Sequence, residues 1–288
     1  RLVADAAADG TFTLVVPPVE FTVRATYGDT TVEVVKFDAY VERTIALPDG
    51  VDPNRITTGV VVDADGTVRH VPTRIIVVDG RYYAVINSLT NSAYTVVWNS
   101  VEFTDVAAHW AKDTVNNMGS RLIMAGTGGG RFSPERDVTR AEFAAMVVRA
   151  LGLGPEEGAG VFPDVQASDW YDSAVRTAYA YGLMGGFDDG TFRPDDKITR
   201  EQAMVVIARA MGLTGLAAKL PDAPAEAVLG AYADTNRASA WAIDSIADCV
   251  QAGIVAGRSG GMLAPQDTVT RAEAATMVER LLQMSDLI

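Results

Sequence analysis

The chain has 288 residues, of which 48% are hydrophobic and 21% charged, and its formal net charge is −13 at pH 7. This composition is typical of a folded globular protein of about two domains. No apolar run is long enough for a membrane-spanning helix, and the acidic balance argues against nucleic-acid binding, which needs a basic face. Because the chain begins at Arg1 with no signal segment, we expect it to be part of a longer protein.

Residues 1–100 are predicted to form an all-β, sandwich-like module of about seven strands. Apolar side chains alternate at 12–16 and again at 21–27, as they do in half-buried strands. Asp-Gly pairs at 65–66 and 79–80 separate β-rich runs and predict hairpins, and the pair at 49–50 predicts a further turn. The expected strands around the two hairpins are 59–62, 68–71, 74–78 and 81–86.

Beyond residue 100 the pattern becomes helical, and one composite motif occurs three times with a period of roughly 60 to 70 residues. Each copy has an aspartate, a tryptophan, a glycine that opens a loop, a proline and a Thr-Arg pair. Their positions are Asp105, Asp164 and Asp234; Trp110, Trp170 and Trp241; Gly126, Gly186 and Gly257; Pro134, Pro194 and Pro265; Arg140, Arg200 and Arg271. So strict a period predicts three copies of one structural unit.

Each unit is expected to contain two helices joined by the glycine-rich loop. In the first unit we expect Trp110, Val115 and Met118 to face inward from the first helix, and a second helix over 140–151. The connectors between units are predicted at 154–160 and 216–230, and the second one, which contains two prolines, is expected to be an exposed crossing.

The second helix of every unit begins with a capping box. Thr-x-x-Glu or Thr-x-x-Gln starts at Thr139, Thr199 and Thr270, and this pattern satisfies free backbone N–H groups at a helix start. It does not account for the arginine that follows each threonine, because a cation in the first turn faces the positive end of the helix dipole. Two explanations remain open: the arginine binds an external anion, or it pairs with the aspartate of the motif inside the fold.

The tryptophans and the glycine loops are also open to two interpretations. A tryptophan near a helix start can anchor the core, or its exposed indole can serve as a flat platform for a sugar ring. The glycine-rich loops at 126–130, 185–190 and 257–261 are predicted first of all to be turns with positive φ, and they would also let a ligand approach the backbone.

Catalysis is not expected of this chain. The Gly-x-Ser-x-Gly pattern at 257–261 follows a predicted helix and precedes no histidine, whereas a nucleophile elbow needs a strand before it and a histidine after it. His70 and His109 are the only histidines, which leaves no expected metal site or cofactor. The single cysteine, Cys249, is expected to be a small buried hydrophobic residue.

Taken together, the motifs at 103–144, 162–203 and 232–273 resemble the S-layer homology domain, and the third copy departs most, with Tyr232 and Leu263 in place of phenylalanines. The resemblance covers 101–283 as one body of three repeats, at 101–154, 160–215 and 230–283. It implies a mainly α, pseudo-threefold fold with a central helical bundle and grooves between repeats. Residues 1–100 resemble, more weakly, β modules found upstream of such repeats in bacterial surface proteins.

The resemblance also implies a function outside the cell. It implies non-covalent anchoring to the Gram-positive cell wall or S-layer through a secondary cell-wall polymer, often a glycan with pyruvylated N-acetylmannosamine. The arginines would hold the carboxylate, the tryptophans would pack on sugar, and the aspartates would bind polar sugar groups or position the arginines. Two alternatives stay open: assembly with neighbouring S-layer subunits, and a separate carbohydrate-binding or hydrolytic role for residues 1–100.

Overall fold

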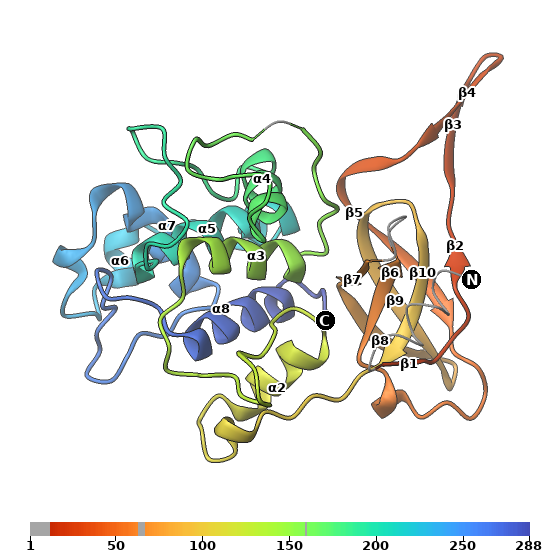
Figure 1. The fold of residues 1–288 in the computed structure, drawn as a ribbon, viewed down its shortest axis with the longest axis horizontal. Helices are drawn as coiled ribbons and strands as arrows, with labels where there is room; N and C mark the ends of the chain where they lie inside the picture. Colours follow the sequence, from red (N-terminus) through yellow and green to blue (C-terminus); the bar gives the residue numbers. More distant parts are fainter. Residues whose placement is uncertain (1–11, 63–66, 159) are drawn as a thin grey trace.

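The computed structural model describes residues 12–62, 67–158 and 160–288. A β module built from the first third of the chain lies beside a helical body built from the rest (Figure 1). None of the helices in these described ranges has the length and apolar character that a bilayer-spanning segment needs.

The β module consists of antiparallel sheets. One sheet has the strand order β1-β10-β6-β7 with β2 also paired to β10, a second has the order β5-β9-β8, and β3 and β4 form a separate hairpin. The two larger sheets share one buried cluster, to which Val61, Tyr94 and Val96 contribute from one side and Ile45 and Ile86 from the other. The strands are β1 Thr13–Leu14, β2 Val19–Glu20, β3 Val23–Tyr27, β4 Thr30–Val34, β5 Lys36–Ala46, β6 Thr58–Val62, β7 Val68–Val71, β8 Thr73–Val78, β9 Arg81–Thr90 and β10 Ala93–Trp98.

The predicted hairpin at Asp79-Gly80 is confirmed. Val78 pairs with Arg81 across the turn, and Asp79 and Gly80 have φ values of 50° and 77°, as a two-residue turn of type I′ requires. The other predicted turn, Asp65-Gly66, lies outside the described residues, although β6 and β7 on either side of it pair antiparallel. The β3–β4 hairpin, which the alternation at 21–27 only half anticipated, projects away from the rest of the module (Figure 1).

The helical body contains the expected pairs of helices and one additional short helix, α6. The helices are α2 Lys112–Ser120, α3 Arg140–Ala150, α4 Asp172–Ala180, α5 Arg200–Thr214, α6 Ala225–Leu229, α7 Ile243–Gln251 and α8 Arg271–Met284; short 3₁₀ turns are η1 Pro53–Arg55 in the β module and η2 Thr104–Val106, η3 Ala217–Lys219, η4 Thr235–Arg237 and η5 Ala240–Ala242 in the helical body.

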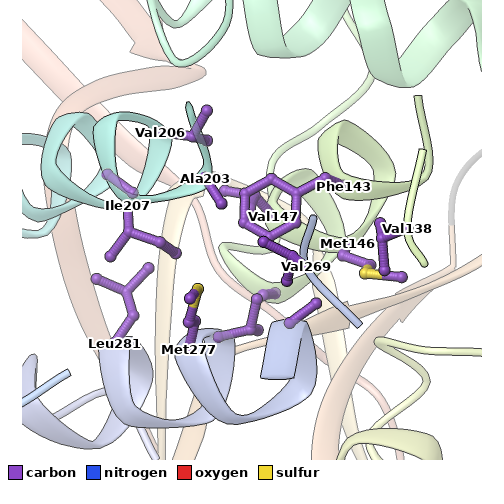
Figure 2. Close-up of a cluster of buried hydrophobic side chains, with 14 of the residues drawn as sticks. Val138, Phe143, Met146, Val147, Ala203, Val206, Ile207, Val269, Met277 and Leu281 are labelled. Atoms are coloured by element: carbon purple, nitrogen blue, oxygen red, sulfur yellow. The ribbon is translucent and has the colours of Figure 1, made fainter. Parts of the chain in front are cut away.

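The three second helices, α3, α5 and α8, begin as predicted. In each one the threonine side chain accepts a hydrogen bond from the backbone N–H three residues later, and the Glu or Gln side chain accepts one from the threonine N–H. These helices bring their apolar faces together in one buried cluster, in which Phe143, Ile207 and Leu281 lie close to one another (Figure 2). The capping boxes therefore set where the central helices start, and the shared core holds the helices together.

The repeats are joined in a closed cycle of backbone hydrogen bonds. Just before the central helices, the N–H of Val138 donates to the carbonyl of Val269 (2.9 Å), that of Val269 to Ile198 (3.2 Å), and that of Ile198 back to Val138 (3.1 Å). In addition, the first N–H of each central helix donates to the loop of the next repeat, so that Arg140 N meets Asp196 O at 2.9 Å. Each central helix therefore starts against the next repeat's loop.

Two expectations about the helical body need correction. Val115 and Met118 are fully buried, but Trp110, which lies just before α2 at Lys112, is exposed at the edge of a groove lined mainly by the third repeat. The connector 216–230 is not simply an exposed crossing, since it contains η3 and α6, and Leu216 and Leu229 are buried in the common core.

The β module is held against the first repeat by side chains that donate to backbone carbonyls. Tyr40 donates to Leu151, Arg69 to Gly152 and Asn99 to Ser120, each at 2.7 Å. Gly152 has a φ of 62°, and a Cβ there would lie 2.8 Å from Pro72 Cδ. The end of α3 is thus in close contact with the β7–β8 corner.

Candidate binding grooves

Three grooves open on the helical body, and each one brings together residues from all three repeats. Groove A combines the loop and α3 of the first repeat with Trp170 and Arg271 (590 Å³). Groove B combines the loop and α5 of the second repeat with Trp241 and Arg140 (210 Å³). Groove C combines the loop and α8 of the third repeat with Trp110 and Arg200 (370 Å³). The structure therefore brings each predicted arginine next to a predicted tryptophan from a different repeat.

The helix-start arginines are buried and reach into the loop of the next repeat. Arg140 donates from Nε to the carbonyl of Phe192 (2.9 Å) and from Nη2 to that of Gly185 (3.0 Å). Arg271 makes the same pair of bonds, to Phe132 (2.8 Å) and Ala125 (2.6 Å). Burial lowers the pKa of Arg140, Arg200 and Arg271, so each cation is held at a cost that a nearby anion would offset.

The internal Arg–Asp ion pair that the sequence left open is not formed among the described residues. Neither Arg140 nor Arg271 has a carboxylate within ion-pair distance there, and the Nη1 group of each donates to no acceptor in that part of the chain. Both side chains line their grooves. In grooves A and B, one guanidinium nitrogen of the helix-start arginine therefore has no hydrogen-bond partner among the described residues.

Groove C differs because it already contains a carboxylate that pairs with its arginine. Arg200 Nη1 lies 3.1 Å from Glu273 Oε1, and Arg258 holds the same carboxylate through Nε (2.8 Å) and Nη2 (2.9 Å). In groove B the capping residue at the corresponding place is the neutral Gln202. In groove A, Glu142 pairs instead with Arg136. Groove C is thus the one whose helix-start arginine is matched internally.

All three tryptophans of the motif are exposed. Trp110, Trp170 and Trp241 retain 66%, 62% and 60% of their accessible surface. Such exposure argues against the role of core anchor, because a core anchor would be buried. Each indole stands at the edge of a groove, where it can contact a flat ligand.

The aspartates of the motif bind the loops rather than the arginines. Asp105 accepts hydrogen bonds from the N–H groups of Phe132 and Ser133, both at 2.8 Å, and Asp164 and Asp234 make equivalent pairs of bonds. Ser133 has a φ of 59°. The aspartate therefore stabilises the turn whose carbonyl accepts from Arg271, and it positions the arginine only indirectly. None of the three lines its groove.

The in-register glycines line the grooves and make room for the aromatic residue that opens each repeat. A Cβ on Gly126 would lie 2.9 Å from Phe103, one on Gly186 2.6 Å from Phe162, and one on Gly257 2.8 Å from Tyr232. The prediction that these loops contain positive φ is confirmed, for example at Gly128 and Gly257, but Gly126 and Gly186 themselves do not have positive φ. Positive φ is found further along the loops, for example at Gly190.

Sequence reasoning missed three arginines that also line the grooves. Arg149, Arg209 and Arg280 lie nine residues after the capping arginines, one in each groove. Arg209 and Arg280 donate to the carbonyls of Leu183 and Ile254. Their equal spacing from the Thr-Arg pairs was the available signal. Counting these residues, grooves A and C are each lined by three arginines and one glutamate. Groove B is lined by two arginines and no glutamate among the described residues.

Two other kinds of site, a metal site and a reactive thiol, find little support among the described residues. Among the described residues no group of three or more His, Cys, Asp or Glu side chains is placed to hold a metal ion. Cys249 is fully buried, and burial raises the pKa of its thiol. The prediction of a small buried hydrophobic residue is therefore confirmed.

Tandem helical units with similarly built grooves define a repeat protein. Three segments, 102–144, 161–204 and 231–275, match the S-layer homology domain. The chain thus contains three S-layer homology domains, preceded by a β-rich module, and such domains support attachment to the bacterial cell wall or S-layer.

Similar proteins include enzymes and surface-layer proteins. Exoglucanase XynX of Acetivibrio thermocellus is 35% identical over 200 residues, which are 69% of this chain and 18% of that protein. The amylopullulanase of Thermoanaerobacterium thermosulfurigenes is 35% identical over 69% of this chain and 10% of its own length. The surface layer protein of Brevibacillus choshinensis is 32% identical over 44% of this chain and 12% of its own length. The chain thus spans under a fifth of each of these relatives.

Proposed function

We propose that the chain is a non-catalytic anchor that binds an acidic cell-wall glycan in grooves A, B and C. The observation that carries the proposal is that each groove joins an exposed tryptophan to a buried arginine from another repeat, with arginines outnumbering carboxylates. These local positive sites occur on a protein whose net charge is −13. Local recognition by buried arginines explains how an acidic protein can bind an acidic polymer.

The ligand that fits best is a glycan carrying a carboxylate beside a sugar ring, such as a pyruvylated N-acetylmannosamine. Its carboxylate would accept from the unused Nη1 of Arg140 or Arg271, and its ring would lie against the tryptophan. The pseudo-threefold arrangement that the resemblance implies is supported by the closed cycle of hydrogen bonds. Enzymatic activity would then belong to other parts of the full protein.

We expect grooves A and B to bind more tightly than groove C, because Glu273 already occupies Arg200. A carboxylate ligand entering groove C has to displace that pairing or bind beside a like charge.

The test is to measure binding of Arg140→Gln and Arg271→Gln to purified cell walls and, by calorimetry, to the pyruvylated saccharide. Each variant should lose affinity at its groove by roughly tenfold or more, since a charge-assisted hydrogen bond contributes about 1.5–3 kcal/mol. Arg131→Ala serves as the control, because Arg131 is an exposed loop arginine outside all three grooves. Undiminished binding by well-folded groove variants, or binding that survives chemical removal of the polymer, contradicts the proposal.

A second candidate, assembly with neighbouring protein subunits, is favoured by the β3–β4 hairpin. Its register places Val23, Ala25, Tyr27, Val32 and Val34 on one face, and Tyr27 is 92% exposed. Exposed apolar faces of this kind mark protein contacts. Sedimentation of the chain and of Tyr27→Ser over a concentration range distinguishes the two roles, because glycan anchoring does not require self-association.

A further inference from the structure

Besides the three grooves, a smaller cavity lies where the β module meets the first two repeats. It measures 200 Å³, and the structure places it next to groove A, with which it shares Trp170 and Arg149. We call it the junction cavity. Its remaining walls come from β7, the turn after α2, the end of α3 with the following connector, and α4, and they include Val68, Leu122, Pro155 and Ser173.

The sharing of two side chains makes the junction cavity an extension of groove A. Trp170, which is 62% exposed, stands between the two spaces. Arg149 is exposed, and no described side chain or carbonyl accepts a hydrogen bond from its guanidinium, whereas Arg209 and Arg280 each donate to a carbonyl. Of the three arginines that follow the capping arginines by nine residues, Arg149 is therefore the one whose guanidinium remains available to a ligand.

The β module is positioned firmly enough to form one wall of a site. Arg69 and Tyr40 donate to the carbonyls of Gly152 and Leu151, just after α3, at 2.7 Å. The close packing of Gly152 on Pro72 leaves no room for even a methyl group. No described β-module residue lines groove B or groove C.

The chemistry of the junction cavity suits a neutral sugar. Its described walls combine apolar side chains with the hydroxyl groups of Thr67 and Ser173 and with Arg69, His70 and Arg149, and none of the described lining residues is a carboxylate. Arg69 already donates to the carbonyl of Gly152, and burial lowers the pKa of His70, which keeps that imidazole neutral. Ser173 stands three residues after its tryptophan; the corresponding residues in the other two repeats are Asp113 and Asp244. At 200 Å³ the cavity is smaller than the 300–1,000 Å³ typical of drug-sized ligands, which favours a single ring.

We propose that the junction cavity is an additional saccharide subsite, in which the β module binds the neutral sugar adjoining the acidic sugar held in groove A. The proposal rests on the proposed function, because it needs an acidic sugar in groove A. It assigns the β module a part in glycan recognition and makes groove A selective for a longer segment of the polymer than grooves B and C.

The experiment follows the Trp170 resonance of the whole chain labelled with 5-fluorotryptophan, assigned through Trp170→Phe. The probes are pyruvylated N-acetylmannosamine as its methyl glycoside and a disaccharide that adds one neutral N-acetylhexosamine. We expect the disaccharide to bind about tenfold more tightly at Trp170, which corresponds to about 1.4 kcal/mol. Ser173→Tyr and the milder Ala174→Leu should fill the cavity and abolish this gain without weakening binding of the monosaccharide.

Asp244→Tyr is the matched control, because it changes the corresponding exposed position beside groove B and should leave the gain at Trp170 intact. Equal affinity of the two probes for the unaltered chain, or a gain that persists in folded Ser173→Tyr, overturns the junction subsite alone. Failure of both probes to shift any of the groove tryptophans overturns the proposed function and this inference together.

Discussion

A glycine begins the loop of each repeat, and its missing Cβ makes room for the aromatic side chain that opens the same repeat. Gly186 shows the contact clearly, with Phe162 at 2.6 Å and the carbonyl of Thr191 at 2.7 Å from the position of a Cβ. The neighbouring Gly185 has nothing within 4 Å of that position. Of these two adjacent glycines, Gly185 therefore has room for a larger side chain and Gly186 does not.

We predict that Gly186→Ala destabilises the protein by about 1–3 kcal/mol, because overpacking forces the aromatic ring and the backbone to shift. Gly185→Ala should change the free energy of unfolding by less than about 0.5 kcal/mol. Urea unfolding of both variants measures the difference. Equal stability of the two variants contradicts the packing explanation.

The carboxylate of Glu273 pairs with Arg200 and so competes with any acidic ligand for that arginine. We predict that Glu273→Gln increases the affinity of groove C for an acidic saccharide, because it removes the internal partner of Arg200 while Gln can still complete the capping box, as Gln202 does in the second repeat. The Trp110 signal during titration measures this affinity. A loss of affinity instead of a gain shows that the glutamate assists the ligand.

At the scale of elements, the central helices depend on their caps. We predict that Thr199→Ala costs about 0.5–2 kcal/mol, because the N–H of Gln202 loses its side-chain acceptor, whereas Thr199→Ser, which keeps the hydroxyl, stays close to the unaltered protein. Thermal unfolding compares the two, and an unchanged melting temperature for the alanine variant means that the cap contributes nothing.

The glutamates of two capping boxes should also give the fold an acid-sensitive component. Burial alone would raise the pKa of Glu142 and Glu273, but hydrogen bonds from Arg136 and Arg258 and from the capping N–H groups lower it overall. Their stabilisation is therefore complete above the unfolded-state pKa of about 4.3 and is lost as the pH falls below it through the lowered folded-state pKa. The double variant Glu142→Gln, Glu273→Gln should lose less stability on acidification, as pH-dependent urea unfolding will show.

The starts of the central helices and the β8–β9 turn were predicted correctly because short sequence motifs determine them. The capping boxes and the Asp79-Gly80 turn depend on residues that are close in sequence. The destination of Arg271 could not be predicted in the same way, since its acceptors lie 139 and 146 residues away. The exposure of Trp110 was equally undetermined, because it depends on which repeat packs beside it.

If the proposed function holds, we expect the three grooves of one molecule to bind the same polymer together. We predict that a long wall glycan binds roughly 10²–10⁴-fold more tightly than a single saccharide, through effective concentration. The double variant Arg140→Gln, Arg271→Gln should lose most of this gain, while Arg131→Ala keeps it. Surface plasmon resonance on immobilised polymer measures the ratio, and a ratio near one for the unaltered chain shows that one groove acts alone.

The cyclic exchange of residues among the repeats constrains how such a protein can evolve. Since every groove takes its tryptophan, arginine and loop from three different repeats, deleting one repeat would damage all three recognition sites at once. We therefore expect the three repeats to be inherited together. Duplication of the repeats, or their transfer to another protein, is expected to involve all three at once.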